Sequence, residues 1–416
     1  MRIHEAARTG DLERIQTIVT EDRGVDLFEA GHSLYQTPLH VASANGHHPI
    51  VCFLIEKGAD INKGDAYDKT PLYLASEKGH FHVVHYLAKN GAEINAADLS
   101  GLTPLHRATN ICHLLIAQCL VENGANVNAR SAVGITPLYC ATTHGSLPMV
   151  HYLMEKGADP NITLPSNRTL LHVASGQGHL HVVQFFVQNG ADTTARDAGN
   201  QTPLYLASRE GHLSILQHLV ENGANVNTPD DQNRTPLIMA SEKGHVCIVH
   251  YLAKNGAEID AADVAGLTPL HYASNMGHLL IAQCLVENHG ANVNARTSMG
   301  LTPLQMATLM GYIPIALYLL EKGADPNVTE SLNRTVLHLA SWAGHLHVVQ
   351  FFVQKGFDIT ARDGSGSTPL DLARLSGFIA VERYLESMTR VRKCHSLMLF
   401  LIQQGMWDKK VLKRKK

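Results

Sequence analysis

Residues 70–95 read TPLYLASEKGHFHVVHYLAKNGAEIN, and residues 235–260 read TPLIMASEKGHVCIVHYLAKNGAEID. The threonine that opens both segments recurs along the chain, at positions 37, 70, 103, 136, 169, 202, 235, 268, 302, 335 and 368. Every interval is 33 residues except the one from 268 to 302, which is 34 because an extra residue lies at His289–Gly290. A fixed period of this length indicates a repeat array and not a set of separate globular domains.

Each 33-residue repeat predicts two short helices. Thr70 suits the N-cap of the first helix, since its hydroxyl can accept a hydrogen bond from a free amide of the first turn. Pro71 suits the first helical position, where a missing N–H costs nothing. We expect Gly79 to end the first helix and Gly91 the second, in the left-handed conformation common after helices. The residues that follow, AEINAADLSGL, predict a hairpin-like loop that leads to the next threonine.

Two further positions of the repeat carry packing signals. In five repeats the residue after the leucine is a histidine, whose imidazole can bond back toward the cap as a capping-box partner does. These histidines are His40, His106, His172, His271 and His338. An alanine stands five residues after every threonine, and so small a side chain lets a neighbouring helix approach closely. One repeat cannot bury its apolar face alone, so stacked repeats are expected to build a continuous core.

The phrases TPLHVASANGH, TPLHRATNICH and TPLHYASNMGH resemble the signature of the ankyrin-repeat family. The resemblance covers residues 1–386 and implies an all-α repeat solenoid. It would contain about 12 ankyrin repeats of 33 residues, each a helix-turn-helix with a projecting hairpin loop. Departures are local. Cys112 replaces the glycine that ends a first helix, and Asp371 replaces the capping histidine. We expect both to change local stability and not the fold.

The spacing also predicts how the chain is divided. The predicted regions are an incomplete N-terminal capping repeat at 1–36, ten ankyrin repeats at 37–367, a C-terminal repeat at 368–386, and a basic tail with a capping helix at 387–416. The ten repeats are expected to form two five-repeat blocks, 37–201 and 202–367.

The two blocks are interpreted as copies of each other. Residues 70–101 match residues 235–266 at 24 of 32 positions, but match the adjacent residues 103–134 at only 12 of 32. Five repeats were therefore duplicated together. If the duplication repeated a binding surface, two linked sites could act on one dimeric or repetitive partner. Alternatively, it only lengthened the array.

Composition and charge set broad limits on the class of protein. The formal net charge is −3, which favours neither nucleic acid nor a membrane as partner. Residues 387–416 hold nine Lys or Arg and one acid, so the tail carries +8 and residues 1–386 carry −11. The sequence lacks an apolar signal segment at its start and a run long enough to cross a bilayer. We expect a soluble cytoplasmic protein, with nuclear entry through the basic tail as a further prediction.

Metal, cofactor and catalytic motifs are not predicted. The seven cysteines include no CxxC pair and are interpreted as buried free thiols of a reducing compartment. Thirteen of the 26 histidines fall on two structural positions of the repeat, and a metal site would need a third converging ligand. No hydrolase, nucleotide-binding or dinucleotide motif is present, so we expect no enzyme and no cofactor.

The family resemblance also implies a modification. Asparagines of the loops that follow a leucine by eight residues resemble the pattern hydroxylated by the oxygen-sensing asparaginyl hydroxylase. These are Asn62, Asn95 and Asn128, and also Asn161 and Asn327. A structural role in the turn would explain the same asparagines.

Four functions were considered. The architecture and the resemblance favour a non-enzymatic scaffold, a monomer that binds a protein partner on the concave face of the solenoid. The alternative is a substrate adaptor or regulatory subunit of a partner enzyme, such as a ubiquitin ligase or a phosphatase. A tether between membrane proteins and the cytoskeleton would need accessory domains, and an enzyme would need a motif.

The partner-binding surface is predicted from variation between repeats. The seventh and eighth residues after each threonine are expected at the end of the first helix, facing the groove. They are mainly polar in the first block and become apolar toward the C-terminus. With the adjacent loop, the predicted binding residues are Met276, Met299, Leu301, Leu309, Met310 and Trp342. Contiguous exposed apolar side chains commonly mark an interface. Alternatively, these side chains pack on one another or on the tail.

Overall fold

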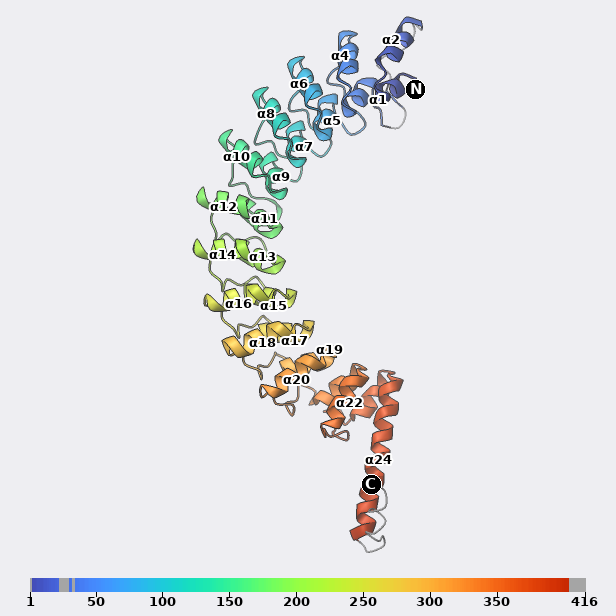
Figure 1. The fold of residues 1–416 in the computed structure, drawn as a ribbon, viewed down its shortest axis with the longest axis vertical. Helices are drawn as coiled ribbons and strands as arrows, with labels where there is room; N and C mark the ends of the chain where they lie inside the picture. Colours follow the sequence, from blue (N-terminus) through green and yellow to red (C-terminus); the bar gives the residue numbers. More distant parts are fainter. Residues whose placement is uncertain (1, 22–29, 32–33, 404–416) are drawn as a thin grey trace. The chain divides into compact units, whose positions relative to one another are not determined.

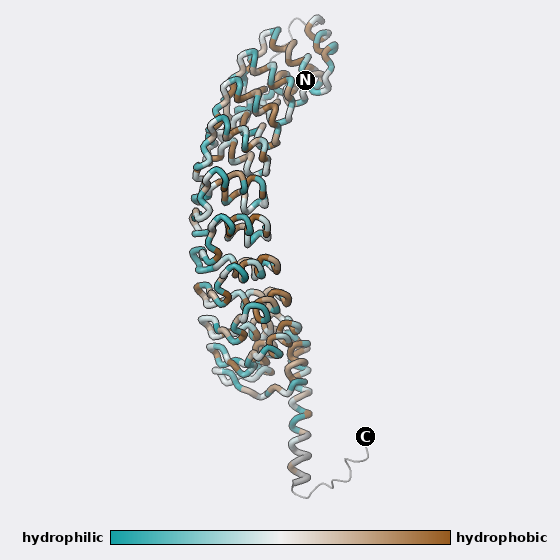
Figure 2. The backbone as a smooth tube through the Cα atoms, turned by 60° about the vertical axis from the view of Figure 1, so that its left-hand side comes forward, coloured by the Kyte–Doolittle hydropathy of each residue, from teal (hydrophilic) through white to brown (hydrophobic). Residues whose placement is uncertain are grey.

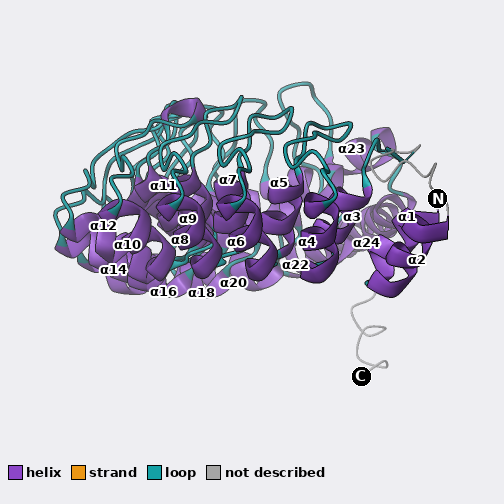
Figure 3. Ribbon diagram, turned by 90° about the horizontal axis from the view of Figure 1, so that it is seen from above, coloured by secondary structure: helices purple, strands orange, loops and turns teal. Residues whose placement is uncertain are grey.

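Helices form all the regular secondary structure in the part of the chain that the structure, a computed structural model, describes. The described residues are 2–21, 30–31 and 34–403. Each repeat contributes two antiparallel helices and a loop, and Figure 3 shows the loops gathered on one side of the helices. The expected all-α solenoid of about 12 helix-turn-helix repeats is confirmed.

The chain divides into two structural units, which are described separately. Unit 1 comprises residues 1–207 and 217–224, and unit 2 comprises residues 208–216 and 225–416. The helices of unit 1 are α1 (Arg2–Thr9), α2 (Leu12–Glu21), α3 (Pro38–Ala44), α4 (His48–Glu56), α5 (Pro71–Lys78), α6 (Phe81–Lys89), α7 (Pro104–Asn110), α8 (Leu114–Glu122), α9 (Pro137–Thr143), α10 (Leu147–Glu155), the 3₁₀ turn η1 (Pro165–Asn167), α11 (Leu170–Gln177) and α12 (Leu180–Gln188).

The division falls within one helix pair, α13 (Pro203–Glu210) and α14 (Leu213–Glu221). The helices that lie wholly in unit 2 are α15 (Pro236–Lys243), α16 (Val246–Lys254), α17 (Pro269–Met276), α18 (Leu279–Gln283), the π-helix η2 (Cys284–Asn288), α19 (Pro303–Met310), α20 (Ile313–Glu321), α21 (Val336–Trp342), α22 (Leu346–Gln354), α23 (Pro369–Leu375) and α24 (Ile379–Gln403). Figure 1 labels most of these helices along the chain.

The helix ends follow the predicted signals. Thr70 is extended, and its Oγ1 accepts a hydrogen bond from the Tyr73 amide at 3.2 Å, so it caps α5. Pro71 is the first residue of that helix. Gly79 ends it with φ of 83°, in the left-handed region that residues with a Cβ rarely adopt. Gly91 follows α6 with φ of 92°. Both predicted helix ends are confirmed.

Buried histidines join the cap of one repeat to the loop of the next. The Thr37 amide donates to His40 Nδ1 at 3.1 Å, while His40 Nε2 lies 3.1 Å from the carbonyl oxygen of Lys69. Because Nδ1 accepts, Nε2 must carry the proton and donate, which fixes a neutral imidazole. The same bridge recurs at His106, His172, His271 and His338. The capping-box role expected of these histidines is confirmed.

Six repeats have another side chain at this position, among them Gln305 and Asp371. Gln305 Oε1 accepts from the Thr302 amide at 2.9 Å, and its Nε2 donates to the Val328 carbonyl at 2.8 Å, so an amide makes the same bridge. Asp371 accepts from the Thr368 amide at 2.9 Å, which completes the cap. An aspartate has no donor at neutral pH, so it cannot reach onward to a carbonyl. Asp371 lies in the last repeat that has a TPL motif, so no following TPL repeat needs this second hydrogen bond.

A second set of histidines links several repeats back to the preceding ones. His80 Nε2 lies 3.0 Å from the Ala44 carbonyl oxygen at the end of the previous first helix. The same bond is made by His47, His179, His245, His278 and His345. The ring also covers the glycine that ends that helix, and a Cβ added at Gly79 would lie 2.7 Å from the His113 ring. Glycine is therefore required there by both backbone conformation and packing.

The core is built from the apolar positions of both helices. Leu72 and Ala75 of α5, with Val84 and Leu87 of α6, are fully buried. First helices pack on first helices, such as α3 on α5, and second helices on second helices, such as α4 on α6. Burying one such leucine contributes about 1.5–3 kcal/mol. The small side chain at Ala75 leaves room for the adjacent helix, as the sequence predicted.

The last helix runs through the predicted start of the tail. Val381 and Leu385 of α24 are buried, and Arg392 donates to the Phe357 carbonyl at 3.1 Å. The predicted boundary at residue 387 thus lies inside one continuous helix, which is followed here as far as Gln403. The basic cluster of residues 409–416 lies outside the described residues. Among the helices that the structure describes, none combines the length and the apolar character needed to cross a membrane.

The buried histidines predict acid-sensitive stability. Burial lowers the pKa of His40, His106, His172, His271 and His338 below the ordinary 6.5. The unfolded chain therefore binds more protons as the pH falls below about 6.5, and unfolding becomes easier. The stabilisation is complete above that pH and declines toward the lowered folded pKa values. Urea denaturation between pH 7 and about 5, above the range where carboxylates titrate, should show a falling midpoint.

The chain supplies its own control for this prediction. His271→Gln copies the bridge of Gln305 without a titrating group, so it should keep stability near pH 7 and reduce the pH dependence. His271→Ala should destabilise the protein at both pH values, because it leaves the Thr268 amide unpaired, at a cost of about 1–3 kcal/mol. A midpoint independent of pH in the wild-type chain would contradict the assignment of neutral bridging imidazoles.

A second prediction concerns Cys112, which has φ of 56° where other repeats have glycine. The following repeat has Ser146, not a histidine, at the position of the covering ring, which accommodates the extra side chain. A left-handed conformation costs a residue with Cβ about 1–2 kcal/mol. Cys112→Gly should therefore stabilise the protein, by about 0.5–1 kcal/mol after the entropy of glycine is counted.

Gly79→Ala is the matched comparison for Cys112→Gly. It adds a Cβ at an equally left-handed position that the His113 ring already covers. Chemical denaturation should show it to be destabilising by more than the strain alone. Equal and small effects of the two substitutions would show that backbone strain and ring packing are unimportant here.

Candidate partner-binding surface

Three predicted binding residues lie at the ends of first helices in successive repeats of unit 2, Met276 and Met310 eight residues after the threonine and Trp342 seven residues after it. Met276, Met310 and Trp342 are each the last residue of a first helix, namely α17, α19 and α21. Their exposed fractions are 41%, 46% and 48%. Met299, on the loop before α19, is 60% exposed. These four side chains, the apolar row, are the predicted residues that offer open apolar surface to a partner.

Leu301 and Leu309 have a different role. Both are half-buried, and their carbonyl oxygens accept hydrogen bonds from the bridging histidines, Leu301 from His271 at 3.0 Å and Leu309 from His345 at 2.8 Å. They hold the repeats together beneath the apolar row. The sequence pattern predicted Leu301 and Leu309 together with the apolar row because it shows the position of a residue in the repeat and not the exposure of its side chain.

The loop tips of unit 2 are tied to one another through their backbones. The Ser298 amide donates to the Ala265 carbonyl at 2.9 Å, the Ser331 amide to the Met299 carbonyl at 3.0 Å, and the Gly364 amide to the Leu332 carbonyl at 2.8 Å. Leu332 is exposed beside Met299 in this series and was missed by the sequence analysis. The tips therefore form an ordered edge, and their apolar side chains sit on a fixed backbone.

Trp342 is also oriented by a charged neighbour. The Arg334 guanidinium carbon lies 5.7 Å from the centre of the indole ring, within range of a cation–π interaction. Arg334 Nε lies 3.5 Å from a carboxylate oxygen of Asp363. Burial favours the protonated form of Asp363, but hydrogen bonds from Ser365 and Ser367 outweigh it and lower the pKa of Asp363 to about 2. The carboxylate thus stays charged and anchors Arg334 under the ring.

Apolar exposure continues past Trp342 into the last repeat. Leu375, at the end of α23, is 78% exposed, and Ile379 at the start of α24 is also exposed. Phe378 takes the place of the histidine ring that covers a glycine in other repeats, here Gly344. Figure 2 shows hydrophobic residues recurring along the helices of the repeats. Leu375 is the seventh residue after Thr368, so it lies at one of the two positions used for the prediction, although it was not among the predicted binding residues.

A cluster of charged side chains lies on the first helices and loops of unit 1. Arg107 donates to the Tyr73 hydroxyl and lies 3.4 Å from Asp98 and 3.5 Å from Glu77, to which Lys69 also pairs at 3.5 Å. The Tyr73 hydroxyl donates to Asp98 at 2.5 Å. Burial raises the pKa of Tyr73, and its hydrogen bond to Asp98 raises it further. The cluster is a satisfied polar network that covers the ends of the first helices.

The copied block does not reproduce this network. Ile238 stands in the place of Tyr73, and Tyr272 in that of Arg107. The Tyr272 hydroxyl donates to Asp263 at 2.8 Å, so the carboxylate keeps a partner without a cation. The two blocks therefore share a backbone structure and differ in the side chains at equivalent positions.

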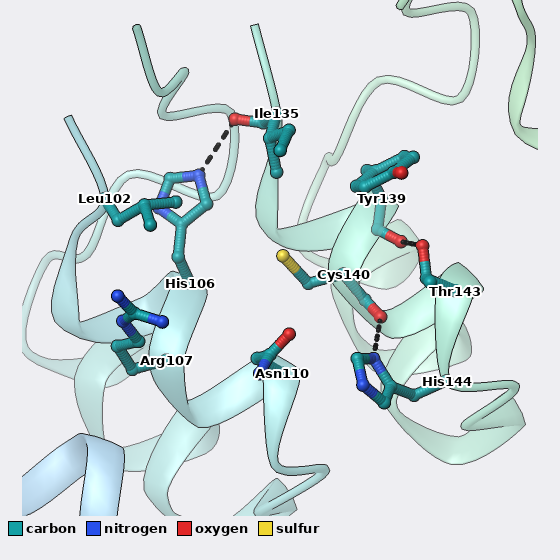
Figure 4. A pocket seen from close by; sticks show the side chains of 9 residues that line it. All are labelled: Leu102, His106, Arg107, Asn110, Ile135, Tyr139, Cys140, Thr143 and His144. Atoms are coloured by element: carbon teal, nitrogen blue, oxygen red, sulfur yellow. Dashed lines mark hydrogen bonds between the residues drawn. The ribbon is translucent and has the colours of Figure 1, made fainter. Parts of the chain in front are cut away.

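A small pocket opens between the first helices α7 and α9 of unit 1 (Figure 4). Its volume is about 130 Å³, and its lining includes Leu102, Tyr139 and Cys140. Burial raises the pKa of the Cys140 thiol to about 11, so the thiol is not a nucleophile at neutral pH. Sites for small molecules usually measure about 300–1,000 Å³. This pocket suits at most a single side chain of a protein partner.

The loop asparagines bridge neighbouring repeats. Asn62 Nδ2 donates to the Gly91 carbonyl at 3.3 Å, and its Oδ1 accepts from the Glu93 amide at 2.7 Å. Asn95 and Asn128 make the same pair of bonds to the repeats that follow them. These contacts supply the structural role that the sequence analysis left as the alternative. Hydroxylation of the three asparagines stays a prediction.

Side chains that could hold a metal converge on the second helices of unit 2. They are His250, Cys284 and His289, and the sequence analysis did not expect them to meet. The histidines counted at two recurring positions of the repeat include neither His250 nor His289. The signal that could have revealed the cluster is the 34-residue interval, since His289 is the inserted residue.

Comparison with protein-family models agrees with this architecture. A model described as ankyrin repeats in three copies matches residues 3–98, 96–164, 170–263 and 237–330, and one described as ankyrin repeats in many copies matches residues 319–373. In a comparison with curated proteins, no match was found. Because the matched segments cover most of residues 3–373, the chain belongs to the ankyrin-repeat family.

Proposed function

We propose that this protein is a non-enzymatic scaffold that binds a protein partner through the apolar row of unit 2. Ankyrin repeats generally mediate protein–protein interaction, and proteins built from them are typically not enzymes. The observation that carries the proposal is the recurrence of Met276, Met310 and Trp342, half-exposed at the first-helix ends of three successive repeats. The bound face is the one formed by first-helix ends and loop tips, the concave face of an ankyrin solenoid.

The chemistry of the apolar row indicates what it would bind. Methionine is flexible and polarisable, so Met276, Met299 and Met310 can adapt to irregular apolar shapes. Trp342 offers a large rigid ring, and tryptophan is enriched among residues that dominate binding energy. The backbone beneath is held by the bridging histidines, so little ordering is needed on association. A partner segment with apolar anchor residues at the spacing of the repeats fits this surface.

The remaining attributes are proposals from the sequence. We place the protein in the cytoplasm as a monomer, with nuclear entry depending on the basic cluster of residues 409–416. An adaptor for a ubiquitin ligase or phosphatase would use the same apolar row to hold a substrate and would need a second docking surface. Nucleic acid is not a proposed partner, because residues 1–386 are acidic overall.

Trp342→Ala should weaken partner binding by at least about 1–2 kcal/mol, because it removes the largest exposed side chain of the row. Met310→Ala should add to the loss, and Leu309→Ala is expected to act mainly through stability, since Leu309 is half-buried. Affinity purification with the full-length chain, followed by titration of the recovered partner against each purified variant, measures both effects.

The first block provides the control for this experiment. His144 occupies in the first block the position of Met310, so His144→Ala should leave binding unchanged. Thermal unfolding of Trp342→Ala should resemble that of the wild type. The proposal fails if Trp342→Ala binds like the wild type, or if it loses binding only because unit 2 has unfolded.

A further inference from the structure

Three metal-ligating side chains meet on the second helices of two adjacent repeats in unit 2. His250 lies on α16, and Cys284 and His289 lie in the next repeat, in and just after η2. One potential ligand atom from each lies within 4.8 Å of the other two. Cys284 Sγ is 3.9 Å from His250 Nδ1, and the two imidazole centroids are 5.6 Å apart. In the described part of the chain, no other group of three such side chains converges as closely.

The inserted residue explains why the cluster forms here. In the other repeats that the structure describes fully, the second helix is α-helical to its end, whereas here α18 gives way to the π-helix η2. A π-turn absorbs one extra residue while the chain on both sides keeps its register, and such turns are frequent at functional sites. The Ala291 amide still returns to the Leu285 carbonyl at 3.0 Å, which closes the helix. His289 is thereby placed beside His250.

The first block contains the same pair without the third ligand. Cys119 Sγ lies 3.7 Å from His85 Nδ1, matching Cys284 and His250. In that repeat Asn123 is followed directly by Gly124, so nothing corresponds to His289. The insertion therefore converts a His–Cys pair that recurs in both blocks into a group of three.

The local chemistry suits a metal ligand at His289. Its Nε2 is buried and has no hydrogen-bond partner among the residues described. Burial, followed by the influence of His250 and Lys254, lowers the pKa of His289. Burial also raises the pKa of the Cys284 thiol, so a metal must displace its proton on binding. The ammonium of Lys254 opposes a cation, and a thiolate ligand would offset that charge.

We propose that His250, Cys284 and His289 bind a divalent transition metal of the zinc class, with water at a fourth, open position. Sulfur and imidazole ligands at tetrahedral geometry are the set that zinc prefers. Bond lengths of about 2.3 Å to sulfur and about 2.0 Å to nitrogen would bring the three ligand atoms slightly closer than they lie now. His250 is exposed, so its side chain can move to complete the site.

Titration of the full-length, metal-stripped protein with Co²⁺ and with Zn²⁺ tests this proposal. Cobalt should give a thiolate-to-metal charge-transfer band and the intense visible absorption of a tetrahedral ion, at one equivalent, and Zn²⁺ should displace it. His250→Ala, Cys284→Ser and deletion of His289 should each weaken zinc binding by at least about 100-fold, since even residues that only support a ligand cost 10–100-fold. The deletion restores the 33-residue period and should fold.

The first block supplies the matched controls, because His85→Ala and Cys119→Ser remove the equivalent pair. Both should keep the cobalt spectrum and the zinc affinity of the wild type. Cys247→Ser should keep them as well, since Cys247 is an exposed thiol on the same helix as His250. The proposal is wrong if cobalt binds without a thiolate band, if His250→Ala, an exposed position, leaves affinity unchanged, or if the control variants lose binding equally.

Discussion

The structure depends on a buried neutral imidazole that accepts a hydrogen bond from the threonine cap of its own repeat and donates one to the loop of the next. A hydrogen bond makes a net contribution of about 1 kcal/mol to folding stability, but leaving one buried partner unpaired costs more than that. The bridge at His106, for instance, leaves neither the Thr103 amide nor the Ile135 carbonyl unsatisfied. Repeats joined by this bridge complete one another, and stacked repeats of this kind are not independently stable.

The backward links follow from the same requirement. His80 returns to the carbonyl of the preceding first helix, and its ring fills the space that a glycine leaves open. Where the ring is missing, at Ser146, the preceding glycine has become Cys112. The left-handed turn and the ring thus form a coupled pair, and losing one removes part of the constraint on the other. Acid should act on the forward bridges, because burial lowers the pKa of their rings.

The sequence was sufficient for the fold because the frame-forming residues are periodic. Thr70, Pro71 and Gly79 act through their own local chemistry, and each acted as predicted. Features that depend on contacts between repeats were harder to predict. Periodicity could not show that Leu309 is half-buried beside an exposed Met310, nor that α24 would run past residue 387. The cluster at His289 was missed because a one-residue insertion breaks the period on which the analysis relied.

The duplication shows which positions are free to specify a partner. The threonine caps and the alanines five residues after them recur in both blocks. The bridging position differs, since His40 corresponds to Tyr205, and so does the first-helix end, where His144 corresponds to Met310. Two copies with the same frame and different exposed chemistry are poorly suited to bind one partner twice. Lengthening of the array accounts better for the divergence, and the shared backbone then serves as a support whose binding specificity is set by a few exposed side chains.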